Sequence, residues 1–252
     1  MPSSSAAAPY KLQRTLVERP WGGEIWFTAE PALPLLVKFI YTRQPLSFQV
    51  HPGDEYAALH HNGRGKTEMW YVVRAEPDSR IALGFREPVT PVQLREAALS
   101  GEIENLVNWV SPQPGDAFLT RAGTVHAIGA GIELWEIQQN SDITYRLFDY
   151  GRGRELHLDH AMNVIDTRRA DSAPVPLPIS SEYFHTDRIE CAASMEYPAN
   201  LERFHLLIVM KGPGTIAGQP FNEGEVWLLP PAAPGFILQC DGGAEFLRTW
   251  AP

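Results

Sequence analysis

Short runs of β-forming residues, each closed by turn residues, dominate this chain of 252 residues. Proline (22) and glycine (20) are numerous, which indicates many turns and short strands rather than long helices. This pattern is typical of an all-β sandwich or barrel. The length suffices for one large β domain or for two smaller ones. The expected strands are Leu35–Tyr41, Leu46–Val50, Met69–Val73, Arg80–Phe85, Ala117–Thr120, Val125–Ile128, Ile132–Gln138 and Ile143–Phe148.

One helix is expected to interrupt the strands. Thr90 can serve as its N-cap, Pro91 suits the first helical position and Gln93 completes a capping box. Gly101 is the expected stop. A second short helical piece is expected over 105–109.

The remaining local expectations concern pairing and domain boundaries. Met69–Val73 and Arg80–Phe85 flank a turn-like segment and are expected to pair with each other. Proline and small polar residues over 168–181 predict a linker. Strands at Phe204–Met210 and Val226–Leu229 then predict a second β unit with a structural role. The expected organisation is a flexible arm over 1–14, a catalytic domain over 15–167, the linker over 168–181 and a C-terminal domain over 182–252.

Charge and cysteine content narrow the class of protein. The net charge of −9 disfavours nucleic acid and anionic membranes as partners. The N-terminal segment lacks the pattern of a secretory signal, and no apolar run is long enough to span a membrane. Cys191 and Cys240 match no disulfide framework, so we expect reduced thiols. These features predict a cytoplasmic protein, either a monomer or a weak homodimer.

The chemistry-bearing residues lie at alternate positions of the expected strands. Ser47, Gln49 and His51 share one strand face, as do Lys66 and Glu68, because side chains alternate across a strand. His126 ends a glycine-flanked turn. Each of these residues taken alone has a more ordinary structural explanation. Together, two imidazoles, one carboxylate and one amide oxygen suit a divalent metal such as zinc, with the ligands Gln49, His51, Glu68 and His126.

A second set of polar residues shows the same alternation. Asp142, Thr144 and Arg146 share a face of one expected strand, and Glu136 and Gln138 share a face of the preceding one. A charged pair inside a barrel needs a partner or a function, because unpaired buried charge is costly. A structural ion pair at the barrel mouth is the alternative explanation.

Several long motifs carry a resemblance to a known family. The segments ERPWGG, LSFQVHPGDEYA, GKTEMWYVV and GTVHAIGAGIELWEIQQNSDITYRLFDYGR resemble the type I phosphomannose isomerases in their short bacterial form. The match covers roughly residues 15–165 and is weak beyond the linker. It implies a cupin (double-stranded β-helix) barrel with a second, degenerate cupin-like unit. One departure is Arg121, which replaces the proline that is common in the second cupin motif.

The resemblance also implies the site residues and the activity. The family's zinc ligands fall on Gln49, His51, Glu68 and His126, one zinc ion per chain. Lys66 and Arg146 would line the sugar-phosphate pocket, and Ser47, Glu136 and Asp142 match further pocket positions. The implied enzyme interconverts mannose 6-phosphate and fructose 6-phosphate through an enediol. In it, Lys66 and Arg146 stabilise the enediolate or hold phosphate, and Glu136 and Asp142 are candidates for proton transfer.

Two other functions stay open at this point. Two histidines and a carboxylate also form the facial triad of Fe(II) oxygenases, although Gln49, Lys66 and Arg146 favour an anionic substrate. A non-catalytic cupin that binds a sugar phosphate is the second alternative. The presence of both metal ligands and acid–base groups disfavours it, since binding alone needs only part of that set.

Overall fold

The computed structural model describes residues 8–199 and 201–252. The chain divides into two compact units. The larger unit comprises Thr15–Trp26 and Leu36–Pro176. The C-terminal unit comprises Phe27–Leu35, Leu177–Pro252 and the N-terminal segment that ends at Arg14. The last passage of the chain between the units falls between Pro176 and Leu177, inside the predicted linker. Phe27–Leu35 belongs to the C-terminal unit, although it lies within the predicted catalytic domain 15–167.

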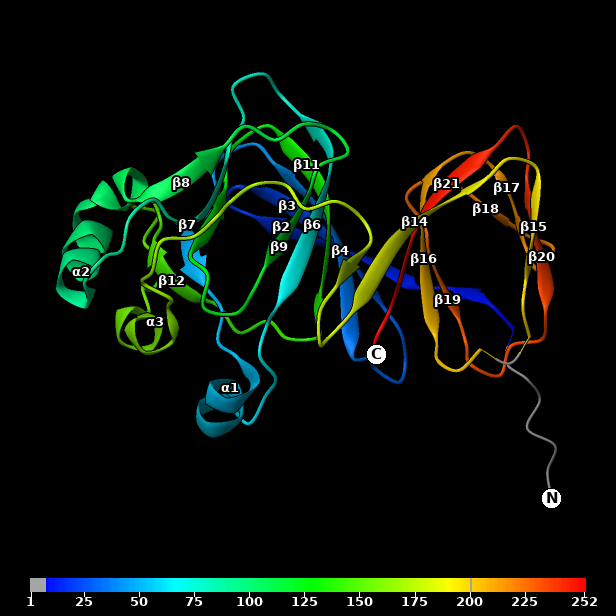
Figure 1. Cartoon of the computed structure of the whole chain (residues 1–252), viewed down its shortest axis with the longest axis horizontal. Coiled ribbons are helices and arrows are strands. Elements are labelled where there is room, and N and C mark those ends of the chain that lie inside the picture. Colours follow the sequence, from blue (N-terminus) through cyan, green and yellow to red (C-terminus); the bar gives the residue numbers. More distant parts are fainter. Residues whose placement is uncertain (1–7, 200) are drawn as a thin grey trace. The chain divides into compact units, whose positions relative to one another are not determined.

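Two sheets build the larger unit (Figure 1). The first has the strand order β2 (Gln13–Arg19), β3 (Gly22–Thr28), β4 (Leu35–Thr42), β11 (Ile132–Gln139), β6 (Glu68–Ala75) and β9 (Ala117–Thr120). The second has the order β12 (Tyr145–Phe148), β5 (Phe48–Val50), β10 (His126–Ile128), β7 (Ile81–Phe85) and β8 (Val107–Val110).

The second sheet is buried on both faces, and this decides which side chains reach the site. On β7, Ile81 and Leu83 join an apolar cluster with residues of the first sheet, such as Trp70 and Leu134. Ala82 belongs to a different cluster, which packs under the helices. Because side chains alternate along a strand, every strand of this sheet has an inner face toward the first sheet and an outer face toward the helices.

Three α-helices, α1 (Asp54–His61), α2 (Pro91–Ser100) and α3 (Leu158–Val164), complete the larger unit with the 3₁₀ helix η1 (Glu102–Asn105). The predicted helix at Thr90 is confirmed as α2. The Thr90 hydroxyl accepts a hydrogen bond from the Gln93 amide N–H at 3.2 Å, and Gly101 ends the helix with φ of +87°. None of the helices in the described part of the chain is long and apolar enough to cross a bilayer.

Two local predictions are wrong. β6 and β7 do not pair with each other, because the segment between them carries the chain from the first sheet to the second. β6 pairs with β11 and β9, and β7 pairs with β10 and β8. The helical piece expected over 105–109 is also wrong, because Val107–Val110 is drawn into strand β8 by pairing with β7.

The C-terminal unit is a second pair of sheets. One has the order β1 (Tyr10–Lys11), β19 (Val226–Leu229), β16 (His205–Lys211), β21 (Ala244–Trp250), β14 (His185–Cys191) and β13 (Ile179–Ser180). The other has the order β15 (Ser194–Tyr197), β20 (Phe236–Cys240), β17 (Gly214–Ile216) and β18 (Gln219–Phe221). An apolar cluster that includes Trp227, Phe246 and Leu238 lies between them.

The N-terminal arm is not free where the structure describes it. Tyr10 and Lys11 pair with Leu228 and Trp227, and the Lys11 ammonium lies 2.8 Å from the Glu225 carboxylate. The prediction of a flexible arm is therefore wrong for this part, because the edge of β19 offers unpaired backbone groups. Residues 1–7 lie outside the described part of the chain.

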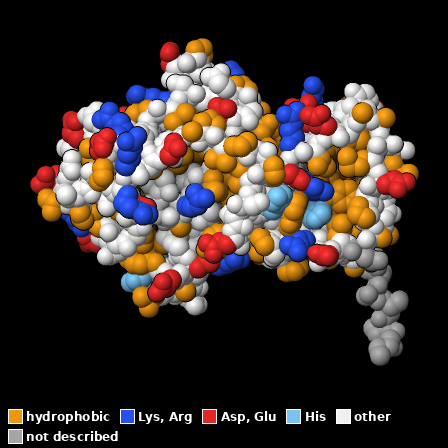
Figure 2. All heavy atoms as spheres, viewed as in Figure 1, with side chains coloured by type: hydrophobic (Ala, Val, Ile, Leu, Met, Phe, Trp, Pro, Cys, Tyr) orange, Lys and Arg blue, Asp and Glu red, His pale blue; other side chains and the backbone are white. Residues whose placement is uncertain are grey.

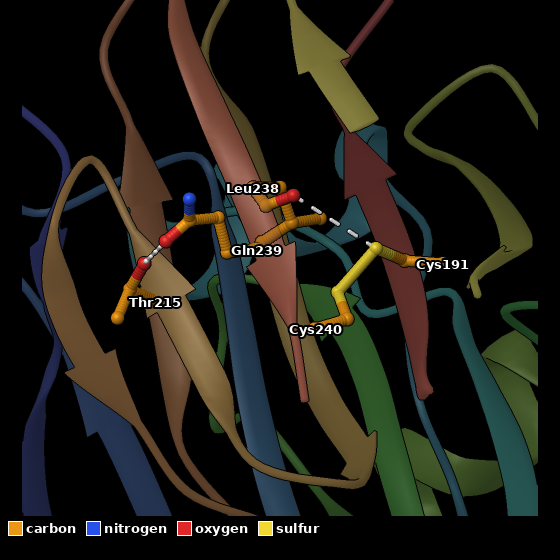
Figure 3. The surroundings of a disulfide bond; sticks show 5 residues. All are labelled: Cys191, Thr215, Leu238, Gln239 and Cys240. Carbon is orange, nitrogen blue, oxygen red and sulfur yellow. Dashed lines mark hydrogen bonds between the residues drawn. A yellow bond between two sulfur atoms is a disulfide. The ribbon is translucent and has the colours of Figure 1, made fainter. Parts of the chain in front are cut away.

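The two cysteines form a disulfide, contrary to the prediction of reduced thiols. Cys191 in β14 and Cys240 in β20 are joined, with their Cα atoms 6.2 Å apart (Figure 3). Their separation of 49 residues hides this proximity in the sequence, because it arises only when the two sheets face each other. The inference of a reducing compartment from cysteine content therefore loses its basis.

The surface mixes charges of both signs. On the face that Figure 2 shows, basic and acidic side chains are interspersed with hydrophobic ones. The excess of carboxylates therefore forms no single acidic patch on that face.

Candidate active site

The site lies on the inner face of the larger unit's two sheets. Gln49 on β5 stands opposite His126 on β10 and Arg146 on β12 in the strand register. Phe48 and Val50, its neighbours in the chain, point outward into the helix-covered cluster. Strand pairing therefore places Gln49, His126 and Arg146 side by side on one face.

His51, Glu68 and His126 form a buried cluster whose ligand atoms all lie within 4.8 Å of one another. The Nε2 atoms of His51 and His126 each lie 3.6 Å from a different Glu68 carboxylate oxygen. The Gln49 amide nitrogen lies 3.2 Å from His126 Nε2. The Gln49 side chain, the fourth predicted ligand, therefore lies next to this three-residue cluster.

The second nitrogen of each histidine fixes the ring. His51 Nδ1 donates to the backbone carbonyl of Ile143 and His126 Nδ1 to that of Thr124, both at 2.9 Å. A neutral imidazole that donates through Nδ1 keeps an acceptor lone pair on Nε2. Both lone pairs therefore face the Glu68 carboxylate, and that of His51 also lies 3.3 Å from the Lys66 ammonium. A metal ion would be bound through the same two lone pairs.

The electrostatics of this cluster also fit a divalent metal. Burial lowers the pKa of His126 to about 4 and, with the nearby Lys66 ammonium, the pKa of His51 well below its usual range. Both imidazoles are therefore neutral at pH 7, as metal ligands must be. Glu68 Oε1 is buried with no hydrogen-bond partner in the described part of the chain. A cation between these groups would satisfy that oxygen.

Two lysines and two glutamates alternate beside the cluster. The Lys66 ammonium lies 2.6 Å from the Glu68 carboxylate and 3.5 Å from that of Glu136. The Lys38 ammonium lies 3.1 Å from Glu136, which also accepts a 3.1 Å hydrogen bond from the Trp70 indole. These four charges balance inside the barrel, so each buried ion has an opposite partner.

The lysines set the protonation of the carboxylates. Burial alone would raise the pKa of Glu136, but the ammonium groups of Lys66 and Lys38 lower it to about 2. Burial raises the pKa of Glu68 to about 7, and the carboxylate of Glu136 adds to this effect while Lys66 opposes it. Burial would lower the pKa of Lys66, but Glu136 and Glu68 raise it overall. Glu136 is therefore ionised and Lys66 protonated at neutral pH.

A cavity of about 260 Å³ opens beside these charges. Five of the predicted site residues line it: Gln49, Lys66, Glu136, Asp142 and Arg146. Asp142 and Thr144 precede β12 rather than belonging to it, yet both reach the cavity wall with Arg146. Ser47 is buried and is not part of this wall. Its hydroxyl donates to the Gln49 amide oxygen at 3.3 Å.

The sequence reasoning gave no site role to the charged cavity residues Arg19, Glu24, Lys38 and Arg154, nor to the apolar ones, Trp21, Trp26, Ile40 and Leu46. Lys38 had a usable signal, because it is a single cation inside the apolar run LLVKFIYT. Glu24 is a buried acid that accepts hydrogen bonds from Arg19 at 3.0 Å and from the Trp26 indole at 2.5 Å. Arg154 carried no signal, since it lies in a loop and reaches the cavity only through tertiary structure.

The fold and the site together define a class of protein. It is a cupin-type barrel whose inner face can hold a divalent metal next to a cavity lined by more cationic than carboxylate side chains.

Comparisons with known proteins identify the family within that class. A scan against protein-family models gives no match. The mannose-6-phosphate isomerase ManA of Bacillus subtilis is 40% identical over 230 residues, which cover 82% of this chain and 72% of that protein. The chain therefore belongs to the mannose-6-phosphate isomerase family.

Solved structures agree on the fold. A crystal structure of a mannose-6-phosphate isomerase from Bacillus subtilis has a TM-score of 0.86 at 24% identity, covering 97% of this chain and all (100%) of that one. A zinc-bound mannose-6-phosphate isomerase has a TM-score of 0.75 at 15% identity, with the same coverage of 97% and 100%. The predicted cupin fold and the predicted family are confirmed.

Proposed function

We propose that this chain is a zinc-dependent aldose–ketose isomerase that interconverts mannose 6-phosphate and fructose 6-phosphate through an enediol. One observation carries the proposal. A cluster of two neutral histidines and a glutamate, which suits a metal, lies beside a cavity with five cationic and three carboxylate side chains. Such a cavity suits an anionic sugar whose carbonyl must be polarised. We assign this chemistry to residues 15–167 and a structural role to residues 182–252.

Gln49, His51, Glu68 and His126 would hold one zinc ion per chain. Zinc bound there supplies a Lewis acid that polarises the carbonyl of the open-chain sugar. Lys66 and Arg146 stabilise the negative charge of the enediolate or bind the phosphate, Lys66 as a point charge and Arg146 through its planar fork. Arg146 lines the cavity, and its Nη1 group donates to the Glu155 carbonyl at 2.9 Å, which helps to hold the guanidinium there.

The two candidate proton-transfer residues differ in environment. With a pKa of about 2, Glu136 is a weak base, and its contacts suit an anchor that fixes Lys38 and Lys66 in place. Asp142 lies at the exposed rim of the same cavity. We therefore assign to Asp142 the removal of the proton from C2 and its return to C1. The variant Asp142→Asn should lower kcat by a larger factor than it changes KM.

The decisive experiment is a coupled isomerase assay with and without chelator. We expect chelation to abolish conversion and stoichiometric zinc to restore it. His126→Ala should lose both zinc and activity, whereas the control His60→Ala, a change on exposed α1, should retain both. A metal-free His126→Ala protein with full activity would remove His126 from the ligand set.

A second pair of variants tests the role of Arg146. Arg146→Ala should retain zinc and lose at least about a hundredfold in kcat/KM, because it removes a charge that stabilises the transition state. The control Arg168→Ala changes an exposed arginine that pairs with Asp166 and should behave as wild type. Unchanged kcat/KM in Arg146→Ala would exclude a catalytic role.

A further inference from the structure

The larger unit contains another cavity, of about 300 Å³, which shares no lining residue with the catalytic one. Pro45, between β4 and β5, contributes to its wall together with four other segments. These are the loop between β6 and β7 (cyan in Figure 1), the turn after β10, the η1–β8 region and the turn after β12. The proposed reaction uses none of these residues.

An unusual turn places Tyr150 at this cavity. The Arg152 amide donates to the Asp149 carbonyl at 3.1 Å, and both intervening residues have positive φ, +53° for Tyr150 and +72° for Gly151. This turn geometry favours asparagine, aspartate or glycine at the position of Tyr150. A bulky side chain there costs about 1 kcal/mol, so the side chain itself needs an explanation.

Packing explains the aromatic ring of Tyr150 but not its hydroxyl group. Its ring lies 4.9 Å from that of Phe148 and 6.2 Å from that of Phe48, centroid to centroid. A phenylalanine would make the same contacts. The hydroxyl has no hydrogen-bond partner among the described residues, although burial and the Glu104 carboxylate raise the pKa of Tyr150 and keep it protonated. An available donor therefore borders the cavity.

Arg80 supplies further donors. Its guanidinium lies 4.2 Å from the centroid of the Trp109 ring, and that ring is fixed by a 2.9 Å hydrogen bond from its indole N–H to the Glu104 carbonyl. Arg80 forms no ion pair in the described part of the chain, although three carboxylates line the same cavity: Glu76, Asp78 and Glu104. A planar cation stacked on a fixed indole thus presents its N–H groups without an internal acceptor.

The charges that line this cavity suit a different ligand from the substrate of the catalytic cavity. Three carboxylates and one guanidinium line it, whereas the catalytic cavity has an excess of cations. A phosphate group would be repelled here. A ring with several hydroxyls fits both kinds of group, because the carboxylates accept hydrogen bonds while Arg80 and Tyr150 donate them.

We propose that this cavity, formed around Arg80, Trp109 and Tyr150, is a second ligand site that binds an uncharged sugar, a hexose without its phosphate. The site lies in the same unit as the catalytic cavity, but it disfavours the anionic phosphate group that the catalytic cavity suits. Its ligand is held by the Tyr150 hydroxyl, the Arg80 guanidinium and the carboxylates opposite them.

Calorimetric titration of the zinc-loaded protein with D-mannose tests the proposal. We expect saturable binding that Tyr150→Phe weakens about tenfold, because that variant removes one hydrogen-bond donor and keeps the ring packing. Tyr10→Phe, a matched change at an exposed tyrosine, should leave the affinity unchanged. Arg146→Ala, which disables the catalytic cavity, should also leave it unchanged.

Four outcomes overturn the proposal. They are the absence of saturable binding, binding that Arg146→Ala abolishes and Tyr150→Phe does not, tighter binding of the cationic sugar D-glucosamine, and an equal loss of affinity in Tyr10→Phe. None of these measurements requires turnover. An inactive protein that binds D-mannose with the expected variant pattern would therefore sink the isomerase proposal and leave this one intact.

Discussion

At the scale of single residues, hydrogen bonds to the backbone orient the groups that do the chemistry. His51 and His126 each donate through Nδ1 to a carbonyl, which leaves Nε2 for a metal. Arg146 is held in a comparable way by His157. The His157 amide donates to the Arg146 carbonyl at 2.8 Å, and the Arg146 amide donates to His157 Nδ1 at 3.2 Å.

This reciprocal pair predicts that His157 positions Arg146. His157→Ala should lower kcat about fivefold with zinc content unchanged, because one hydrogen bond of about 1 kcal/mol is lost. His157→Asn keeps an acceptor at the same place and should recover most of the loss. Steady-state kinetics of both variants checks this. Equal kcat in His157→Ala and wild type would show that Arg146 needs no such support.

The partly buried His205 leads us to predict that the stability of the protein depends on pH. Burial lowers the pKa of His205 to about 4, below the ordinary value of 6.5. Between these two pH values the unfolded chain binds more protons than the folded one. The stabilisation of the fold by neutral His205 is therefore complete above pH 6.5 and is lost as the pH falls toward 4. His205→Gln should lose less stability than wild type between pH 7 and pH 4.5 in urea unfolding. Identical pH profiles would contradict the assignment.

At the scale of elements, local signals located some segments and missed others. The caps of α2 were evident from Thr90, Pro91 and Gly101, because capping depends on neighbours in the chain. Strand alternation predicted for the same reason that Ser47, Gln49 and His51 share one face and that Asp142, Thr144 and Arg146 share another. The partners of β6 and β7 were not evident, since pairing depends on where the chain crosses between sheets.

The N-cap of α2 carries a stability prediction. Thr90→Ala removes the acceptor for the Gln93 amide and should cost about 1 kcal/mol of unfolding free energy. Thr90→Ser keeps a hydroxyl and serves as the matched control. Urea denaturation of both variants measures the difference. A Thr90→Ala protein with the same unfolding free energy as wild type would mean that packing alone stabilises this helix.

At the scale of the whole molecule, the two units draw on different sources of stability. The larger unit has an apolar cluster inside the barrel and another under its helices. The C-terminal unit adds the Cys191–Cys240 disulfide, which joins its two sheets (Figure 3). A crosslink stabilises mainly by restricting the unfolded chain, more so for longer loops.

Reduction of this disulfide should therefore destabilise the C-terminal unit. For a separation of 49 residues the chain-entropy effect is about 4 kcal/mol. Unfolding followed in urea, with and without dithiothreitol, should show the loss, and the variant Cys191→Ala/Cys240→Ala should be insensitive to the reductant. Zinc content should be the same in both proteins. A reductant effect of equal size in the double variant would rule out the disulfide as its cause.

The sequence by itself determined the all-β class, the helix at Thr90 and the metal-ligand candidates, because period-two alternation and capping act between near neighbours. Only the tertiary structure decided that Lys38, Glu24 and Arg154 join the cavity, that the cysteines meet and that Tyr150 borders a second cavity. These depend on which distant strands face each other, and that choice is made by burial of the whole apolar surface rather than by any local segment.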